Sequence, residues 1–248
     1  NIGFINCNLT NTSFLEGEWS DVNFDDCHTE KIIISKLSLN NCQLGKSNFD
    51  LAQITNSNLV NVDFSESKLM KTNFSQSEFK ECNWKRASLE LTNFTSATLI
   101  EASFVGVVLF KQVLFINAKL NGADLSGIEA SETNFLGTDV SDANLEEFKS
   151  SSSQFSQAKL INTNFSLADI QFSNFIKSDL SSANFSRCNL SYSDLSQANV
   201  DNTDFSSANL HLCNIHACVG NPIFSRTNLS GIRKTDQQQL KAENWTYA

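Results

Sequence analysis

The sequence predicts an all-β repeat fold that grows by stacking short, similar units. A large apolar residue returns every five residues over almost the whole chain. All but three of the 20 phenylalanines occupy that position, the exceptions being Phe110, Phe148 and Phe172. A period of five matches neither the helical repeat of 3.6 nor the strand repeat of 2. It suits a chain that takes a short extended step, turns and repeats, so that the apolar residue always points inward.

The clearest stretch of this repeat runs from residue 178 to residue 210. Each unit has a small residue, then Asn or Asp, then Leu or Phe, as in Ala183-Asn184-Phe185. Asn and Asp favour turns because their side chains bond nearby backbone groups. The pattern resembles that of the pentapeptide-repeat family, whose consensus is written A(D/N)LXX. This resemblance implies a right-handed quadrilateral β-helix with four units, hence twenty residues, in each coil.

The repeat divides the chain into two parts. We expect the pentapeptide-repeat β-helix over residues 1–232 and a C-terminal capping helix or tail over residues 233–248. The register begins at Phe4 and holds to Leu109. It resumes after one inserted residue within 110–115, and it changes phase again near 220–222.

Two further patches depart from the pattern. At 28–39 the bulky residues Ile32 and Leu37 stand where small ones belong. At 146–153 the sizes invert, with Phe148 at a small position and Ser150 at a central one. We expect each of these patches, like the insertion, to be a bulge or a local distortion of the wall.

Charge patterns support the twenty-residue coil. If residues twenty apart stack, charges alternate along two ladders, Lys119, Asp139, Lys159 and Asp179, and Glu129, Lys149 and Asp169. Opposite charges on neighbouring strands stabilise a sheet. The repeats then form about eleven coils, and the rod is roughly 50 Å long at a strand spacing of about 4.8 Å.

The positions of the cysteines and the lack of catalytic motifs argue against catalysis and metal binding. All seven cysteines fall at the small inward position, where a thiol acts as a compact apolar filler. No CxxC, nucleophile elbow, Walker loop or dinucleotide fingerprint is present. We therefore expect no enzyme activity, no catalytic residue, no cofactor and no metal. A disulfide between Cys7 and Cys27, one coil apart, is conceivable, but a reducing compartment fits better.

The C-terminus departs from the repeat and predicts a helix. Thr235 to Gln238 resembles a capping box, and Leu240, Ala242 and Trp245 follow it. Such a helix would plug the last coil, because an open β-helix end exposes strand edges and core. In the Qnr-type members of the resembled family, C-terminal elements make a dimer. The chain is accordingly a monomer or a C-terminal homodimer.

Net charge gives the best indication of function. The chain carries 27 acidic and 18 basic residues and a formal charge of −9. This charge argues against nucleic acid as a direct partner. Folded onto four faces, the sequence places Asp124, Glu146, Glu147 and Asp204 on one face, against Arg187 alone. This face is either an ordinary solvated surface or a partner-binding one.

Two functions follow from these observations. The first is a non-enzymatic scaffold that binds a protein partner through an outer face. The second, implied by the Qnr-type members, is DNA mimicry, in which the protein binds DNA gyrase or topoisomerase IV and confers quinolone resistance. A charge of −9 imitates duplex DNA only locally, because 50 Å of duplex bears roughly 30 charges. The scaffold is therefore preferred.

The sequence contains no recognisable membrane-spanning or leader segment. The chain has no run of 18 apolar residues and no charged-then-apolar leader, so we expect no membrane association. A cytoplasmic protein is expected, with a secreted effector as the alternative. The repeat is already in register at Gly3-Phe4, which favours an upstream segment before Asn1.

Overall fold

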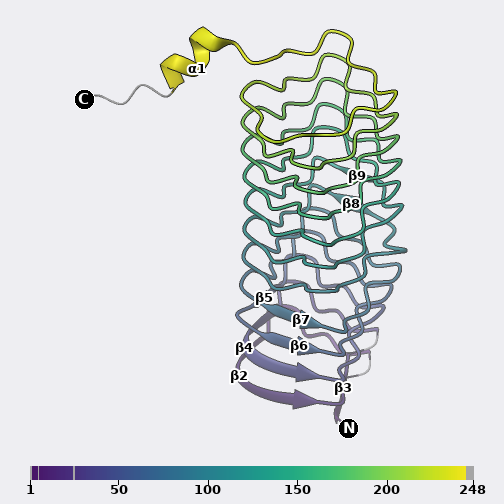
Figure 1. Cartoon of the computed structure of the whole chain (residues 1–248). Helices are drawn as coiled ribbons and strands as arrows, with labels where there is room; N and C mark the ends of the chain where they lie inside the picture. The colour runs from purple at the N-terminus through teal and green to yellow at the C-terminus, as the bar shows by residue number, and fades with distance from the viewer. Residues whose placement is uncertain (1, 5, 25, 244–248) are drawn as a thin grey trace, which may run out of the picture.

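The computed structural model describes residues 2–243 except 5 and 25. The chain winds into a rod of stacked coils, a right-handed quadrilateral β-helix, with one short helix at the C-terminal end (Figure 1). The regular strands are short and lie mostly in the first coils: β1 (Ile2–Gly3), β2 (Ser13–Ser20), β3 (Val22–Asn23), β4 (Ile33–Asn40), β5 (Gln53–Thr55), β6 (Asn58–Val60), β7 (Glu78–Lys80), β8 (Phe110–Lys111) and β9 (Ala130–Ser131). Single parallel bridges take their place elsewhere.

Residues twenty apart lie side by side, as the charge ladders predict. Strand β2 pairs in parallel with β4, with Phe14 opposite Ile34. One column of paired residues runs Asn8, His28, Asn48, Lys68, Ser88, Leu109, then through β8–β9 to Glu129, Lys149, Asp169, Asn189, Asn209 and Asn228. It advances in eleven steps, in agreement with the predicted number of coils.

The small–Asn/Asp–large pattern has a direct structural reason. Two residues after each inward residue the backbone turns a corner in the left-handed region, as at Asn162 with φ 57°. Asn and Asp just before the inward residue brace this corner. For example, the Asn164 Oδ1 accepts the Ser166 N–H at 3.1 Å, and the Asn184 amide donates to Asn164 at 3.1 Å. The Asn side chain thus holds both its own corner and the coil above.

The core is a set of stacked aromatic and aliphatic columns. Phe135, Phe155 and Phe175 stack on successive coils with ring centroids 4.7 and 4.8 Å apart. Small residues fill the space between columns. The Thr163 hydroxyl, fully buried, donates to the Val140 carbonyl at 2.9 Å, so its polar atom has a partner.

The inserted residue lies earlier than the sequence suggests. Ser88 pairs with Leu109, twenty-one residues on, and Phe110 is the buried inward residue while Leu109 is 39% exposed. The insertion therefore falls between Phe104 and Phe110, and its prediction within 110–115 is wrong. Every residue of the run Val107–Phe110 is apolar, so the spacing alone cannot choose among them. Gly106, with φ +81°, is part of this altered turn.

The other two patches keep the wall in register. Strand β4 pairs with β2 at the usual spacing, with Ile32 and Leu37 buried inside. The predicted inversion at 146–153 is confirmed, since Phe148 and Ser150 are both buried, yet Glu129 still pairs with Lys149. Neither patch is a bulge, because the pairing keeps its twenty-residue spacing, and of the two predicted alternatives only a local distortion of the wall is left. A large residue beside a small one fills the same interior volume.

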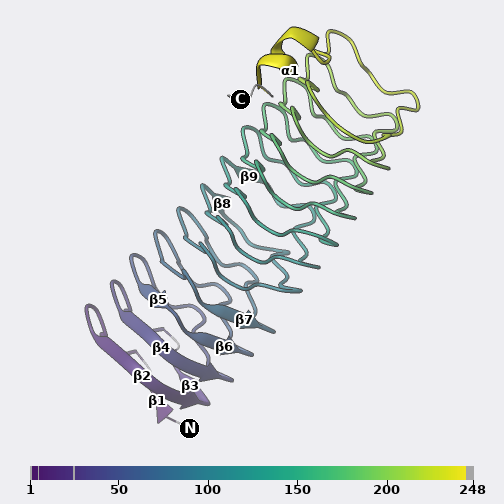
Figure 2. The ribbon, with the colours of Figure 1, turned by 60° about the vertical axis from the view of Figure 1, so that its left-hand side comes forward.

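The predicted C-terminal helix is confirmed as α1 (Gln237–Glu243), and it begins one residue later than the capping box implies. The Asp236 carboxylate accepts the Gln238 and Gln239 N–H groups at 2.8 and 3.2 Å, so Asp236 is the N-cap. None of the seven residues of α1 is buried. They lie beside the last coils rather than over their open end, unlike the predicted plug (Figure 2). Trp245 lies outside the described residues.

The one helix among the described residues, α1, has seven residues, whereas a bilayer-spanning helix needs about 20.

Candidate functional site

The rod has four walls, which we call A, B, C and D in the order in which the chain runs through them. Each is defined by its inward column: wall A by Leu125, Leu145, Phe165, Phe185 and Phe205, wall B by Phe110, Ile170, Leu190 and Leu210, wall C by Phe115, Phe135, Phe155 and Phe175, and wall D by Leu120, Val140, Leu160 and Leu180. Walls A and C are opposite. Strand β5 marks wall C, and β6 and β7 mark wall D (Figure 1).

The structure places the four predicted site residues on or at the edge of wall A, but not together. Asp124 and Asp204 belong to one column, with three asparagines between them at Asn144, Asn164 and Asn184. Four coils separate the two carboxylates, which is about 19 Å at a strand spacing of about 4.8 Å. Glu146 and Glu147 lie one coil from Asp124. The acidic surface is therefore a pair of glutamates with one aspartate nearby and another far along the rod.

Asp124 and Asp204 have structural partners. The Asp124 Oδ1 accepts the Ser126 N–H at 3.0 Å and the Asn144 amide at 3.3 Å. The Asp204 Oδ1 accepts the Ser206 N–H at 2.8 Å. Both side chains are half-buried and bond the backbone as the asparagines of the same column do. An asparagine makes the same backbone hydrogen bond, so the negative charge of the two aspartates is not needed for it.

Glu146 and Glu147 are different, because both side chains are exposed. Within the part of the chain that the structure describes, neither takes part in an ion pair. On wall B, in contrast, Lys149 lies 2.9 Å from Glu129, and its hydrogen bond lowers the pKa of that carboxyl. The two glutamates are therefore the exposed part of the acidic face without an ion pair, although the charge of Glu147 contributes to raising the pKa of Lys149.

The thiols show the properties of a packed core. Cys42, Cys188 and Cys213 are buried and free, and Cys82 and Cys218 are half-buried and free. Burial raises the pKa of Cys82 to about 12 and the pKa values of Cys213 and Cys218 to about 11. Such thiols are protonated at neutral pH and are poor nucleophiles. Among the described residues no group of His, Cys, Asp and Glu could hold a metal ion.

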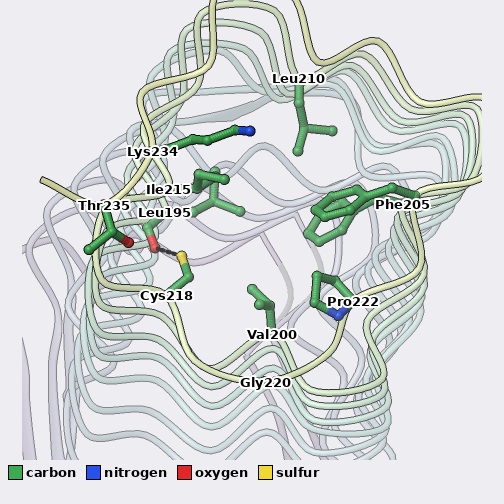
Figure 3. A pocket seen from close by; sticks show the side chains of 11 residues that line it. Leu195, Val200, Phe205, Leu210, Ile215, Cys218, Gly220, Pro222, Lys234 and Thr235 are labelled. Carbon is green, nitrogen blue, oxygen red and sulfur yellow. Dashed lines mark hydrogen bonds between the residues drawn. The ribbon is translucent and has the colours of Figure 1, made fainter.

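The C-terminal end of the rod has a hollow that the sequence reasoning missed. It has a volume of about 370 Å³ and is lined mainly by the inward residues of the last coil, including Leu195, Phe205 and Ile215, with Lys234 extending over it (Figure 3). The repeat ends here, so no further coil of side chains covers the inward residues of the last one. The phase change near 220–222 was the available signal, because Gly220 and Pro222 line the same hollow.

Comparison with known proteins concerns the repeat and the fold. A family model described as pentapeptide repeats matches residues 36–69, 47–83, 72–109, 110–146, 151–187 and 183–219. The break between 109 and 110 and the gap at 147–150 coincide with the insertion and the size inversion. No curated protein matches the chain.

Several solved structures resemble the rod at low identity. HetL, a pentapeptide repeat protein involved in heterocyst differentiation regulation in the cyanobacterium Nostoc sp. strain PCC 7120, is 21% identical, with 93% of this chain and 88% of that chain covered and a TM-score of 0.34. QnrB1, a plasmid-mediated fluoroquinolone resistance protein, is 20% identical, with 87% and 99% covered and a TM-score of 0.42. A pentapeptide repeat protein of the Arabidopsis thaliana thylakoid lumen is 28% identical, with 36% and 69% covered and a TM-score of 0.23.

Proposed function

This chain belongs to the pentapeptide repeat family. Because its fold offers long outer walls rather than an enclosed active site, we propose that it is a non-enzymatic scaffold that binds a protein partner through wall A. The observation that carries the proposal is the pair Glu146 and Glu147. Both are exposed, and neither has an ion-pair partner in the described chain. Exposed rim charges that form no ion pair steer a partner of opposite charge and select it against others. The partner is accordingly a protein with a basic surface.

DNA mimicry with a type II topoisomerase as partner is the second candidate. It is favoured by the position of Asp124, Glu146, Glu147 and Asp204 along one wall of a straight rod (Figure 2). The charge density weighs against it. Over the roughly 19 Å from Asp124 to Asp204, duplex DNA carries about 11 charges at one per 1.7 Å. The column instead has three neutral asparagines between its two aspartates. The scaffold therefore stands first.

Neutralising wall A tests both candidates. The variant carries Asp124→Asn, Glu146→Gln, Glu147→Gln and Asp204→Asn. It is expected to fold normally, because asparagine already fills the same backbone-bonding role at Asn144 and Asn164. Its matched control removes the same charge from wall B and its edge, with Glu30→Gln, Asp50→Asn, Glu90→Gln and Glu132→Gln.

The readouts separate the candidates. Wild type, wall A variant and wall B control are compared in supercoiling assays with gyrase and topoisomerase IV, with and without a quinolone. They are also compared in binding assays with a partner isolated on immobilised wild type. Binding lost in the wall A variant alone, and weakened by salt over a Debye length of about 10 Å at 0.1 M, supports wall A as the site. An effect on a topoisomerase, lost in the same variant, selects mimicry. Equal binding by all three proteins would overturn wall A as the site.

A further inference from the structure

Wall C differs from the other three walls in charge. From Ser13 to Ile176 its outward residues, those directly before and after each inward residue, are serine, threonine, asparagine, glutamine, leucine or isoleucine. None is charged over nine successive rows, and all of them are described. The other walls carry charges over the same coils, for example Lys85 on wall A, Glu90 on wall B and Glu78 on wall D. The chain therefore has one neutral wall on a molecule with a net charge of −9.

The polar groups of wall C are largely satisfied by one another. The Asn73 amide donates to the Gln53 Oε1 at 2.9 Å, and the Asn93 amide donates to the Asn73 Oδ1 at 3.2 Å. The Asn73 Oδ1 also accepts the Ser75 N–H at 3.1 Å. Amides that are already bonded lose little when water is removed. Between them, Leu15, Ile33 and Leu136 expose apolar surface.

The edge between walls B and C adds an apolar ridge. Its corner column includes Leu51, Leu91, Phe172, Tyr192 and Leu212, all exposed and all with φ between 56° and 64°. Large apolar residues are unusual in this left-handed region, where Asn and Gly are favoured. The exposed rings of Phe172 and Tyr192 stack with their centroids 4.9 Å apart. The same corner column also contains Lys31, Lys71 and Glu132, so the charge-free surface is wall C itself, with apolar corner residues along part of its edge. A neutral, partly apolar surface of this kind marks an interface.

We propose that wall C is a dimerisation surface and that its occupant is wall C of a second copy of this chain. Depletion of charge is the compositional mark of an interface core. Two copies with a charge of −9 repel each other, and wall C is where they can approach without bringing like charges into contact. A second copy also has the same row spacing of about 4.8 Å, so rows of side chains stay in step along the whole wall.

The geometry determines the form and strength of the dimer. Face-to-face sheets pack about 10 Å apart, and a two-fold axis parallel to the rod makes the contact self-complementary, with each row of one copy opposite the same row of the other. The neutral rows end at Ile176. Asp194 follows in the column, and α1 is bonded to the last rows through His216 and Glu243. The contact is thus roughly 40 Å by 10 Å, which is small for a stable interface and predicts a weak, reversible dimer.

Such a dimer leaves the opposite walls free. Wall A of each copy faces outward, away from the contact, so two acidic faces are displayed on opposite sides. This inference does not depend on the function of wall A, because the dimer is measured with the purified chain alone.

Sedimentation equilibrium over a wide range of protein concentration tests the proposal. Wild type is expected to show a reversible monomer–dimer equilibrium that strengthens with added salt, because salt screens the repulsion between the two copies. The variant Ile116→Lys with Leu136→Lys places charge on wall C and is expected to raise the dimer Kd by about tenfold or more. Its control, Ile100→Lys with Ile161→Lys, makes the same change on wall D and is expected to leave the Kd unchanged. Circular dichroism melts check that all three proteins fold.

A cross-linking experiment provides a second measurement. Leu136→Cys adds an exposed thiol to wall C, whereas Cys188 and Cys213 are buried and unreactive. Mild oxidation is expected to give a disulfide-linked dimer of Leu136→Cys, and no such dimer of the wall D control Ile100→Cys. Wild type that stays monomeric at its highest soluble concentration in high salt would overturn the proposal. A dimer that persists in the wall C lysine variant would do the same and would point to the C-terminal hollow instead.

Discussion

The rings of Phe155 and Phe175 lie one coil apart, parallel to within 3° and with their centroids 4.8 Å apart. This distance equals the spacing of strands in a β-sheet and is also a favourable distance for stacked rings. Phe175 meets Phe165 and Phe185 of the opposite wall edge-on, at 84° and 86°. A single repeat thus satisfies stacking along a wall and edge-to-face packing between walls, which explains why phenylalanine dominates the inward position.

Truncating an inward ring is expected to be costly. Phe175→Ala removes a fully buried ring from this column and should lower the free energy of unfolding by about 3–5 kcal/mol. Phe172→Ala is the matched control, because Phe172 is 55% exposed and contacts mainly Tyr192. It should cost about 1 kcal/mol or less. Urea unfolding midpoints of the two variants compare them, and equal shifts would contradict the assignment of inward and outward positions.

Removing a whole coil should be tolerated better than removing half of one. Deletion of residues 160–179 joins Lys159 to Leu180 and places Lys159 opposite Asn199, so every later residue stays on its wall. Deletion of residues 160–169 moves every later residue to the opposite wall. Thermal melts followed by circular dichroism should show a cooperative, near-wild-type transition for the first deletion and a much lower Tm for the second. Equal melting temperatures would speak against four walls.

The buried thiols predict a loss of stability at alkaline pH. Burial raises the pKa of Cys213 from its ordinary value of 9.0 to about 11, and that of Cys82 to about 12. Unfolded thiols therefore ionise first, and their contribution to stability is present below pH 9 and is lost as the pH rises through the folded values. Tm should fall between pH 9 and pH 11, and less steeply in Cys213→Ala. At neutral pH a thiol reagent should label the native protein slowly and the urea-unfolded protein fast. Rapid native labelling of Cys213 would contradict its burial.

The helix cap predicts a change at acid pH. Hydrogen bonds from the Gln239 and Gln238 N–H groups lower the pKa of Asp236 below its ordinary value of 3.8. The cap is therefore present above that value and lost as the pH falls below it. Hydrogen exchange of the Gln238 and Gln239 amides should accelerate below pH 3.8 beyond the intrinsic rate. It should also accelerate at neutral pH in Asp236→Ala, whereas Asp236→Asn keeps the acceptor and should leave exchange slow. Fast exchange in both variants would mean that the cap depends on charge alone.

The sequence predicted on which wall the candidate site residues lie, but not which hydrogen bonds and ion pairs they form. The spacing of twenty correctly placed Asp124 and Asp204 in one column. Their hydrogen bonds to Ser126 and Ser206 were not predictable, since they depend on side-chain torsions at each corner. The same holds for Glu146 and Glu147, whose lack of an ion pair follows from what the neighbouring coils present. The sequence alone therefore overstated the aspartates as free charges.

The sequence by itself determined the five-residue period and most of the inward positions. A five-residue period places one large inward side chain in each unit, with a small inward residue two positions earlier, and the family resemblance implied four units in each coil. Tertiary structure alone decided three further points, namely the place of the inserted residue before Phe110, the position of α1 beside the wall, and the open hollow beneath Lys234. All three lie where the five-residue period breaks. Where the period breaks, neighbouring apolar residues compete for one interior position, and packing against the adjacent coil, rather than spacing along the chain, decides which of them is buried.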